Sequence, residues 1–253
     1  MSSLSKILVI AAVALLSALP VSAQQAQQQQ PLPPALNAAI LSGNGNAVQQ
    51  AIQVLSAGNP ARAAQLAEQV IITAERLLAT NPRAAIEAAS AAVGIVSQQA
   101  VTTSAPSQAL NVAVTAARIF TNPQVQAVAP QLVASVSQSS AAIVSNPAVY
   151  QVNPTASQGV MASAYQAVTT PAVSQASPGA AANVASVLTQ AAQSQALNQT
   201  AGNTSSTITQ ILNPTGLSNS FTNTNTNSST LGGEQPDFTP PREENPNQSG
   251  SPT

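Results

Sequence analysis

The sequence has no cysteine, no histidine and no tryptophan, and its single lysine is Lys6, near the amino terminus. The absence of cysteine excludes disulfides, thiolate chemistry and lipid attachment at a cysteine. Without histidine and cysteine, the chain cannot build the Ser-His-Asp or Cys-His arrangements of nucleophilic catalysis or the usual zinc sites. We therefore expect no catalytic residue, no metal ligand and no cofactor.

Acidic side chains are also few. The only aspartate is Asp237, and the helix-forming part of the chain holds three glutamates, Glu68, Glu75 and Glu87. Glu68 and Glu75 are seven residues apart, so they could share one side of a helix as the acid and base of a glycosidase. Neighbouring arginines favour ordinary surface ion pairs instead, and Arg83 with Glu87 has the i,i+4 spacing of such a pair. The protein is accordingly predicted not to be an enzyme.

Charge of either sign is missing over a long stretch, because residues 119–233 contain no Asp, Glu, Lys or Arg. Without Lys6 the chain has five arginines against seven acidic residues, so its formal net charge is −2. This charge is too weak to attract nucleic acid or an anionic membrane. An uncharged surface has little electrostatic repulsion between copies, which favours self-association. A bias in composition with no role in assembly is the alternative.

Long apolar runs are limited to the amino terminus. Lys6, the apolar residues 7–19 and the small residues 21–23 form the three parts of a secretory signal peptide. A retained membrane anchor is the alternative, but a membrane-spanning helix needs about 20 apolar residues. We expect residues 1–23 to be removed and the mature protein to be exported, without a membrane span, to a periplasmic or extracellular location.

Proline is abundant and recurs at a spacing of 24 residues. Two columns of apolar residues keep the same spacing. The proline series are Pro82, Pro106, Pro130, Pro154 and Pro178, then Pro123, Pro147 and Pro171; the apolar columns are Val112, Val136, Val160 and Val184, then Val101, Val125, Val149, Val173 and Leu197. Fixed periods of about 20–50 residues are typical of stacked supersecondary units.

The residues around these prolines indicate what the spacing builds. Proline fits the first position of a helix, because its missing N–H has no partner there. The residue before proline is held outside the helical conformation, as an N-cap must be. The Ala-rich segments between prolines are strong helix formers. The predicted caps are Asn59, Asn81, Asn122, Asn146, Asn153, Thr170 and Ser177, whereas Ala105 and Ala129 precede prolines without offering a cap.

We therefore predict an all-α fold of Ala-rich helical repeats, about 24 residues each and begun by proline, stacked as a solenoid or an irregular bundle. One continuous Ala-rich rod is the alternative, but prolines inside a helix cost about 3 kcal/mol each. Apolar residues seven apart share one helix face. The residues expected to be buried are Val112, Val136, Val160 and Val184, and, in a stripe along residues 60–79, Ala63, Leu66, Ala67, Val70, Ala74, Leu77 and Leu78.

The two ends of the chain differ from its middle. Residues 24–33 are expected to be a Gln-rich disordered lead-in, and residues 34–201 the helical repeat domain. Residues 202–253, rich in Asn, Thr, Ser and Pro, are expected to be a disordered tail with one short helix at 206–212. The N-x-[ST] pattern of glycosylation occurs at Asn198, Asn203, Asn227 and Asn247, where composition alone also produces it.

The function predicted from these features is a secreted, non-enzymatic structural or interaction protein. Its uncharged surface would serve self-association or an unidentified protein partner, with no nucleic acid involved. One alternative is a binder of an extended non-protein surface such as polysaccharide, ice or mineral, although the threonines do not form one regular row. A further alternative is a spacer that holds the tail away from a surface.

Overall fold

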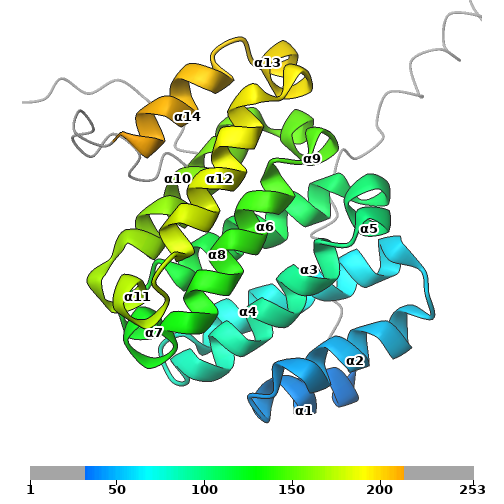
Figure 1. The fold of residues 1–253 in the computed structure, drawn as a ribbon. Helices are drawn as coiled ribbons and strands as arrows, with labels where there is room; N and C mark the ends of the chain where they lie inside the picture. The colour runs from blue at the N-terminus through cyan, green and yellow to red at the C-terminus, as the bar shows by residue number, and fades with distance from the viewer. Residues whose placement is uncertain (1–31, 214–253) are drawn as a thin grey trace, which may run out of the picture. The chain divides into compact units, whose positions relative to one another are not determined.

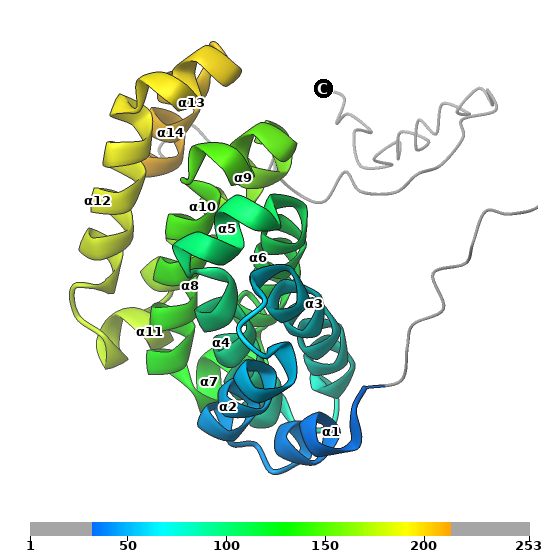
Figure 2. The same cartoon turned by 90° about the vertical axis from the view of Figure 1, so that its right-hand side faces the viewer.

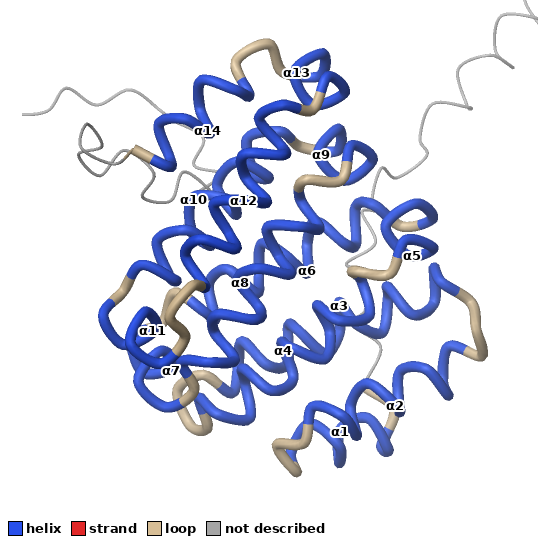
Figure 3. The backbone as a smooth tube through the Cα atoms, viewed as in Figure 1, coloured by secondary structure: helices blue, strands red, loops and turns tan. Residues whose placement is uncertain are grey.

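The structure is a computed structural model, and it describes residues 32–213. Within this range all regular structure is helical and there is no strand (Figure 3). The helices are α1 (Pro34–Leu41), α2 (Gly45–Ser56), α3 (Pro60–Leu77), α4 (Pro82–Val96), α5 (Gln99–Ser104), α6 (Pro106–Phe120), α7 (Pro123–Val128), α8 (Pro130–Val144), α9 (Pro147–Val152), α10 (Pro154–Thr169), α11 (Pro171–Ala176), α12 (Ala180–Gln193), α13 (Gln195–Thr200) and α14 (Thr204–Leu212). The all-α class predicted from the sequence is therefore confirmed.

Helix starts follow local chemistry, since nine of the fourteen helices described begin at a proline. Five of the predicted asparagine caps are confirmed, because their side-chain oxygen accepts a hydrogen bond from a backbone N–H in the first turn. The bonded pairs are Asn59 with Arg62, Asn81 with Ala84, Asn122 with Gln124, Asn146 with Ala148 and Asn153 with Ala156, at 2.9–3.1 Å. Each bond satisfies one of the N–H groups that a helix start leaves unpaired.

Two predicted caps are wrong. The hydroxyl of Thr170 donates to the carbonyl oxygen of Ala167 at 2.7 Å, so it serves the end of α10 and makes no cap bond to α11. Ser177 is not an N-cap, because α12 begins only at Ala180, after a turn through Gly179. Gly179 has φ of +101°, a left-handed backbone that glycine adopts without strain.

We predict that Asn153→Ala lowers the free energy of unfolding by about 1 kcal/mol, since the cap bond to α10 is lost. A denaturant midpoint measured at equilibrium reports this change. The matched control is Asn203→Ala, because Asn203 precedes α14 without a side-chain cap bond and is exposed. Its effect should stay within about 0.5 kcal/mol, and equal losses in the two variants would contradict the capping role.

The longer helices lie in two rows that pack face to face (Figures 1 and 2). One row consists of α2, α4, α8 and α12, each touching the next. The other consists of α3, α6, α10 and α14 in the same manner. Contacts between rows join α3 with α4, α6 with α8 and α10 with α12. The core is the apolar layer between the two rows, so each row keeps one outward face.

Short helices connect the rows at opposite ends of the long helices (Figure 1). At one end α9 touches α5 and α13, and at the other α7 touches α11. Successive long helices therefore run in opposite directions. Two side chains tie a short helix to the end of the preceding long one: the amide of Gln126 donates to the carbonyl of Phe120 at 3.1 Å, and that of Asn198 to Ala192 at 2.9 Å.

The core contains the residues that the sequence spacing selects. The prediction that Val112, Val136, Val160 and Val184 are buried is confirmed, with exposures of 2 % or less. Each short helix from α5 to α13 also buries its residue of the second apolar column at 1 % exposure or less, and these five are Val101, Val125, Val149, Val173 and Leu197. A single continuous rod is excluded for residues 32–213, because these side chains are covered by neighbouring helices.

The short helix predicted at 206–212 is confirmed. It is α14, which begins at Thr204, buries Ile208 and Ile211 and packs against α10 and α12, so the first part of the expected tail is folded. Ile208 lies 24 residues after Val184 and contributes the next apolar side chain to the core. The rest of the expected tail, and residues 1–31, lie outside the described residues. No helix in the described range is long and apolar enough to cross a membrane.

Candidate functional site

The glutamates considered as an acid and a base are used to join two helices. On α3, the carboxylate of Glu68 accepts a hydrogen bond from the side-chain amide of Asn111 on α6, at 2.8 Å. Two turns further along the same side of α3, Glu75 pairs with Arg118 of α6, and the distance from Oε1 of Glu75 to Nη1 of Arg118 is 3.3 Å. These bonds hold α3 alongside α6 in the same row. The expected surface ion pairing is therefore found for Glu75, although its arginine lies 43 residues away in the sequence, whereas Glu68 bonds to a neutral asparagine.

The expected pair between Arg83 and Glu87 is absent from the ion pairs found in residues 32–213. Glu87 instead faces the start of α2, where it lines a pocket. The described part of the chain also has no cluster of three or more acidic, histidine or cysteine side chains that could hold a metal ion.

Three serine hydroxyls are fully buried without a hydrogen-bond partner in the described structure, those of Ser137, Ser140 and Ser157. They lie on α8 and α10, which pack tightly against each other. Their small volume lets the two helices approach. A buried serine could be a nucleophile only with a base beside it, and the chain has no histidine and no lysine after Lys6. We assign these residues to packing.

The outward face of α8 and α12 carries no charge. Its exposed residues on α8 recur at i, i+4, i+7 and i+11, which places them on one side of the helix. The residues of this neutral face are Gln131, Ser135, Gln138 and Ala142 on α8, and Asn183, Ser186 and Gln190 on α12. Because α8 and α12 touch each other and both pack on α10 with their other side, the neutral face extends across two adjacent helices.

Threonine hydroxyls do not form a regular outward array. Thr102 is buried at 3 % exposure. Thr103, Thr121 and Thr169 donate to a carbonyl oxygen of their own helix at 2.7–3.1 Å. Their donors are therefore already used within the protein. This arrangement gives no support to the alternative of an ice-binding surface.

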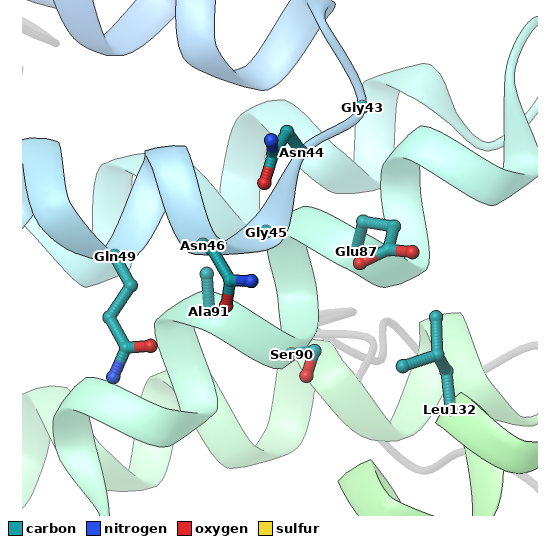
Figure 4. Close-up of a pocket in the computed structure, with 9 residues that line it drawn as sticks. All are labelled: Gly43, Asn44, Gly45, Asn46, Gln49, Glu87, Ser90, Ala91 and Leu132. Carbon is teal, nitrogen blue, oxygen red and sulfur yellow. The ribbon is translucent and has the colours of Figure 1, made fainter.

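A pocket of about 510 Å³ opens where the turn between α1 and α2 meets α4 and α8 (Figure 4). Its lining combines carboxamide, carboxylate and hydroxyl groups with a little apolar surface. The lining residues are Gly43, Asn44, Gly45, Asn46, Gln49, Glu87, Ser90, Ala91 and Leu132. The turn occupies residues 42–44, and no sequence signal places Glu87 and Ser90 beside it.

Glycine makes this meeting of helices possible. A Cβ atom at Gly45 would lie 2.9 Å from the carbonyl oxygen of Glu87 and 3.1 Å from its Oε2, so only glycine allows the close approach of α2 to α4. Gly43 has φ of +65°, which the turn before α2 requires. Asn44 then caps α2 by accepting from the N–H of Ala47 at 3.2 Å. The first turn of α2 is thus fixed against α4.

Two of the four N-x-[ST] asparagines lie in the described range. The side chain of Asn198 is engaged, since its amide donates to Ala192 and its oxygen accepts from the N–H of Ser205 at 3.1 Å. Asn203 is exposed and makes no side-chain cap bond. Asn227 and Asn247 lie outside the described residues.

Comparison with protein-family models, with curated proteins and with solved structures finds no match to this chain. The neutral face and the pocket are therefore interpreted from their own chemistry.

Proposed function

We propose that the protein is a secreted, non-enzymatic scaffold of helical repeats that uses its neutral face to bind other copies of itself or a protein partner. The observation that carries this proposal is the neutral face, which spans α8 and α12 without a charged side chain. Export is part of the proposal and rests on the signal-like composition of residues 1–23.

The positions of the helices support a repeat of about 24 residues. Long and short helices alternate from α4 to α13, and their starts keep this spacing wherever proline begins them. The long helices begin at Pro82, Pro106, Pro130 and Pro154, and the short ones at Pro123, Pro147 and Pro171. Because successive long helices belong to different rows, two such units return the chain to the same row. Contacts of each helix with its row neighbours are what a solenoid requires.

The chemistry of the neutral face favours association over solvation alone. Ordinary soluble surfaces mix charges of both signs, which keep copies apart through hydration and repulsion. The neutral face offers carboxamide and hydroxyl groups, which can donate and accept hydrogen bonds to the same groups on another chain. Bringing such groups together avoids the desolvation cost of burying charge. A repeat array also supplies a broad surface without a deep cleft.

We predict that the mature protein associates with increasing concentration, and that lysines on the neutral face weaken this association. The variant is the triple substitution Ser135→Lys, Gln138→Lys and Gln190→Lys. Like charges brought together at an interface cost several kcal/mol, so the dissociation constant should rise at least about tenfold. Sedimentation velocity over a concentration series measures the dissociation constant for self-association. Affinity capture from the secreted fraction tests for binding of a different protein.

The matched control places three lysines beside the charged side chains of α3 and α6, at the exposed residues Ala61, Gln65 and Ser107. This control adds the same charge and should leave association unchanged. The proposal fails if the mature protein stays monomeric at every concentration and captures no protein that the neutral-face variant loses. It also fails if both triple variants weaken association equally.

A further inference from the structure

The pocket beside the turn at residues 42–44 contains polar side chains that make no hydrogen bond within the described structure. Asn46 and Gln49 of α2 and Glu87 and Ser90 of α4 line the pocket, with Gln49 and Glu87 at opposite ends and Asn46 between them (Figure 4). Elsewhere, asparagine side chains cap helices and serine hydroxyls bond to carbonyls of their own helix. None of these four side chains has a hydrogen-bond partner in the described part of the protein. Their donors and acceptors are free for a ligand.

The pocket is preorganised as well as polar. Gly45 fixes the start of α2 against the backbone of Glu87, and Asn44 caps the same turn. Holding binding groups on packed helices reduces the entropy lost when a ligand is bound. A volume of about 510 Å³ lies within the range of about 300–1,000 Å³ that small-molecule sites show.

The chemistry of the lining excludes most ligand classes. Glu87 is the one charged residue of the lining, and its carboxylate would repel phosphates and carboxylates. A Ca²⁺ site needs several carboxylate or carbonyl oxygens arranged around the ion, and the lining has a single carboxylate. A largely apolar ligand would find only Ala91 and Leu132 to pack against.

A neutral polyhydroxylated ligand satisfies all of these groups. A carboxylate accepts hydrogen bonds from hydroxyl donors, while a carboxamide and a serine hydroxyl can both donate and accept, as adjacent sugar hydroxyls do. Leu132 supplies apolar surface for the C–H face of a sugar ring. We propose that this pocket binds a neutral sugar or short glycan, with Glu87 at one end as its principal acceptor and Gln49 at the other end as its principal amide.

The test is a titration of isotope-labelled full-length protein with maltose, cellobiose and N-acetylglucosamine, followed by NMR. At least one sugar should cause saturable shifts of the side-chain NH₂ signals of Asn46 and Gln49. Glu87→Gln retains the shape of the side chain but removes its charge, and should weaken binding at least about tenfold. Gln49→Ala should also weaken binding, whereas Gln53→Ala, at an exposed position one turn further along α2, should not.

The proposal is overturned if none of the three sugars causes saturable shifts at the pocket. It is also overturned if both Glu87→Gln and Gln49→Ala bind as the unaltered protein does, or if inorganic phosphate saturates the pocket in place of the sugars. Amide spectra of each variant establish that the fold is retained. Association through the neutral face is measured separately, so either proposal can fail without the other.

Discussion

Val149→Asp is expected to remove a large part of the stability of the folded protein. Val149 is fully buried in α9, a short helix that contacts α5, α6, α8, α10 and α13. Either the charged carboxylate would be buried without a partner, which is costly, or α9 would detach from the helices around it. We expect a loss of at least about 4 kcal/mol, against a total stability of about 5–15 kcal/mol for natural domains. Circular dichroism during urea denaturation measures the loss.

The control for this prediction lies in the same short helix. Val152 is 42 % exposed, so Val152→Asp changes the same side chain and the same helix propensity without burying charge. Its cost should remain below about 1 kcal/mol. Similar losses in the two variants would show that burial of Val149 contributes little to the stack, and would remove the physical basis for the regular 24-residue spacing of the buried column.

Val149 and the residues at the equivalent positions of the other units show how much of the fold follows from the sequence. Burial of Val149 and its equivalents follows from spacing, because apolar residues at one position of every unit must meet a common core. Helix starts follow from Asn-Pro pairs, because both residues restrict the backbone locally. Along residues 60–79 the predicted stripe is largely correct, but Leu77 and Leu78 are only partly buried. The stripe also omits Ala64 and Ile71, which are buried. Helix α3 packs against α2, α4 and α6, so more than one of its sides is covered.

Contacts between distant elements do not follow from sequence. The spacing identifies which side of each helix is buried, but it does not identify the helix that covers it. The bond between Glu68 and Asn111 and the ion pair between Glu75 and Arg118 both depend on α3 and α6 lying in one row. The pocket likewise arises only after Gly45 brings α2 onto α4. Local patterns contain no signal for either arrangement.

The sequence pattern also does not predict the role of Tyr150. The positions 24 residues before and after it hold Gln126 and Ser174, so no repeated tyrosine marks this position as buried. The structure buries Tyr150 completely. Its hydroxyl accepts from the side-chain amide of Gln158 at 2.8 Å and lies 2.9 Å from Oγ1 of Thr204. Since Thr204 has one hydroxyl hydrogen, which it donates to a backbone carbonyl, the Tyr150 hydroxyl is the donor to Thr204. This network connects α9 and α10 to the start of α14.

We predict that Tyr150→Ala lowers the free energy of unfolding by about 3–5 kcal/mol and releases α14 first. The loss combines a cavity in the core with two unpaired polar groups. Tyr150→Phe retains most of the volume and removes only the hydroxyl, so it should cost about 1–3 kcal/mol. Native-state hydrogen exchange resolves the order of release: amides around Ile208 and Ile211 should lose protection in both variants, while those of α4 keep theirs in Tyr150→Phe.

Tyr165→Phe is the matched control, since Tyr165 is half-buried on α10 and no hydrogen bond of its hydroxyl occurs in the described structure. Its cost should stay within about 0.5 kcal/mol, and protection of α14 should not change. If Tyr150→Phe and Tyr165→Phe behave alike, the hydroxyl network does not hold α14, and burial of Ile208 and Ile211 alone attaches this helix. If α14 and α4 lose protection together in Tyr150→Phe, the described helices unfold as one cooperative unit, and attachment of α14 is inseparable from the stability of the whole stack.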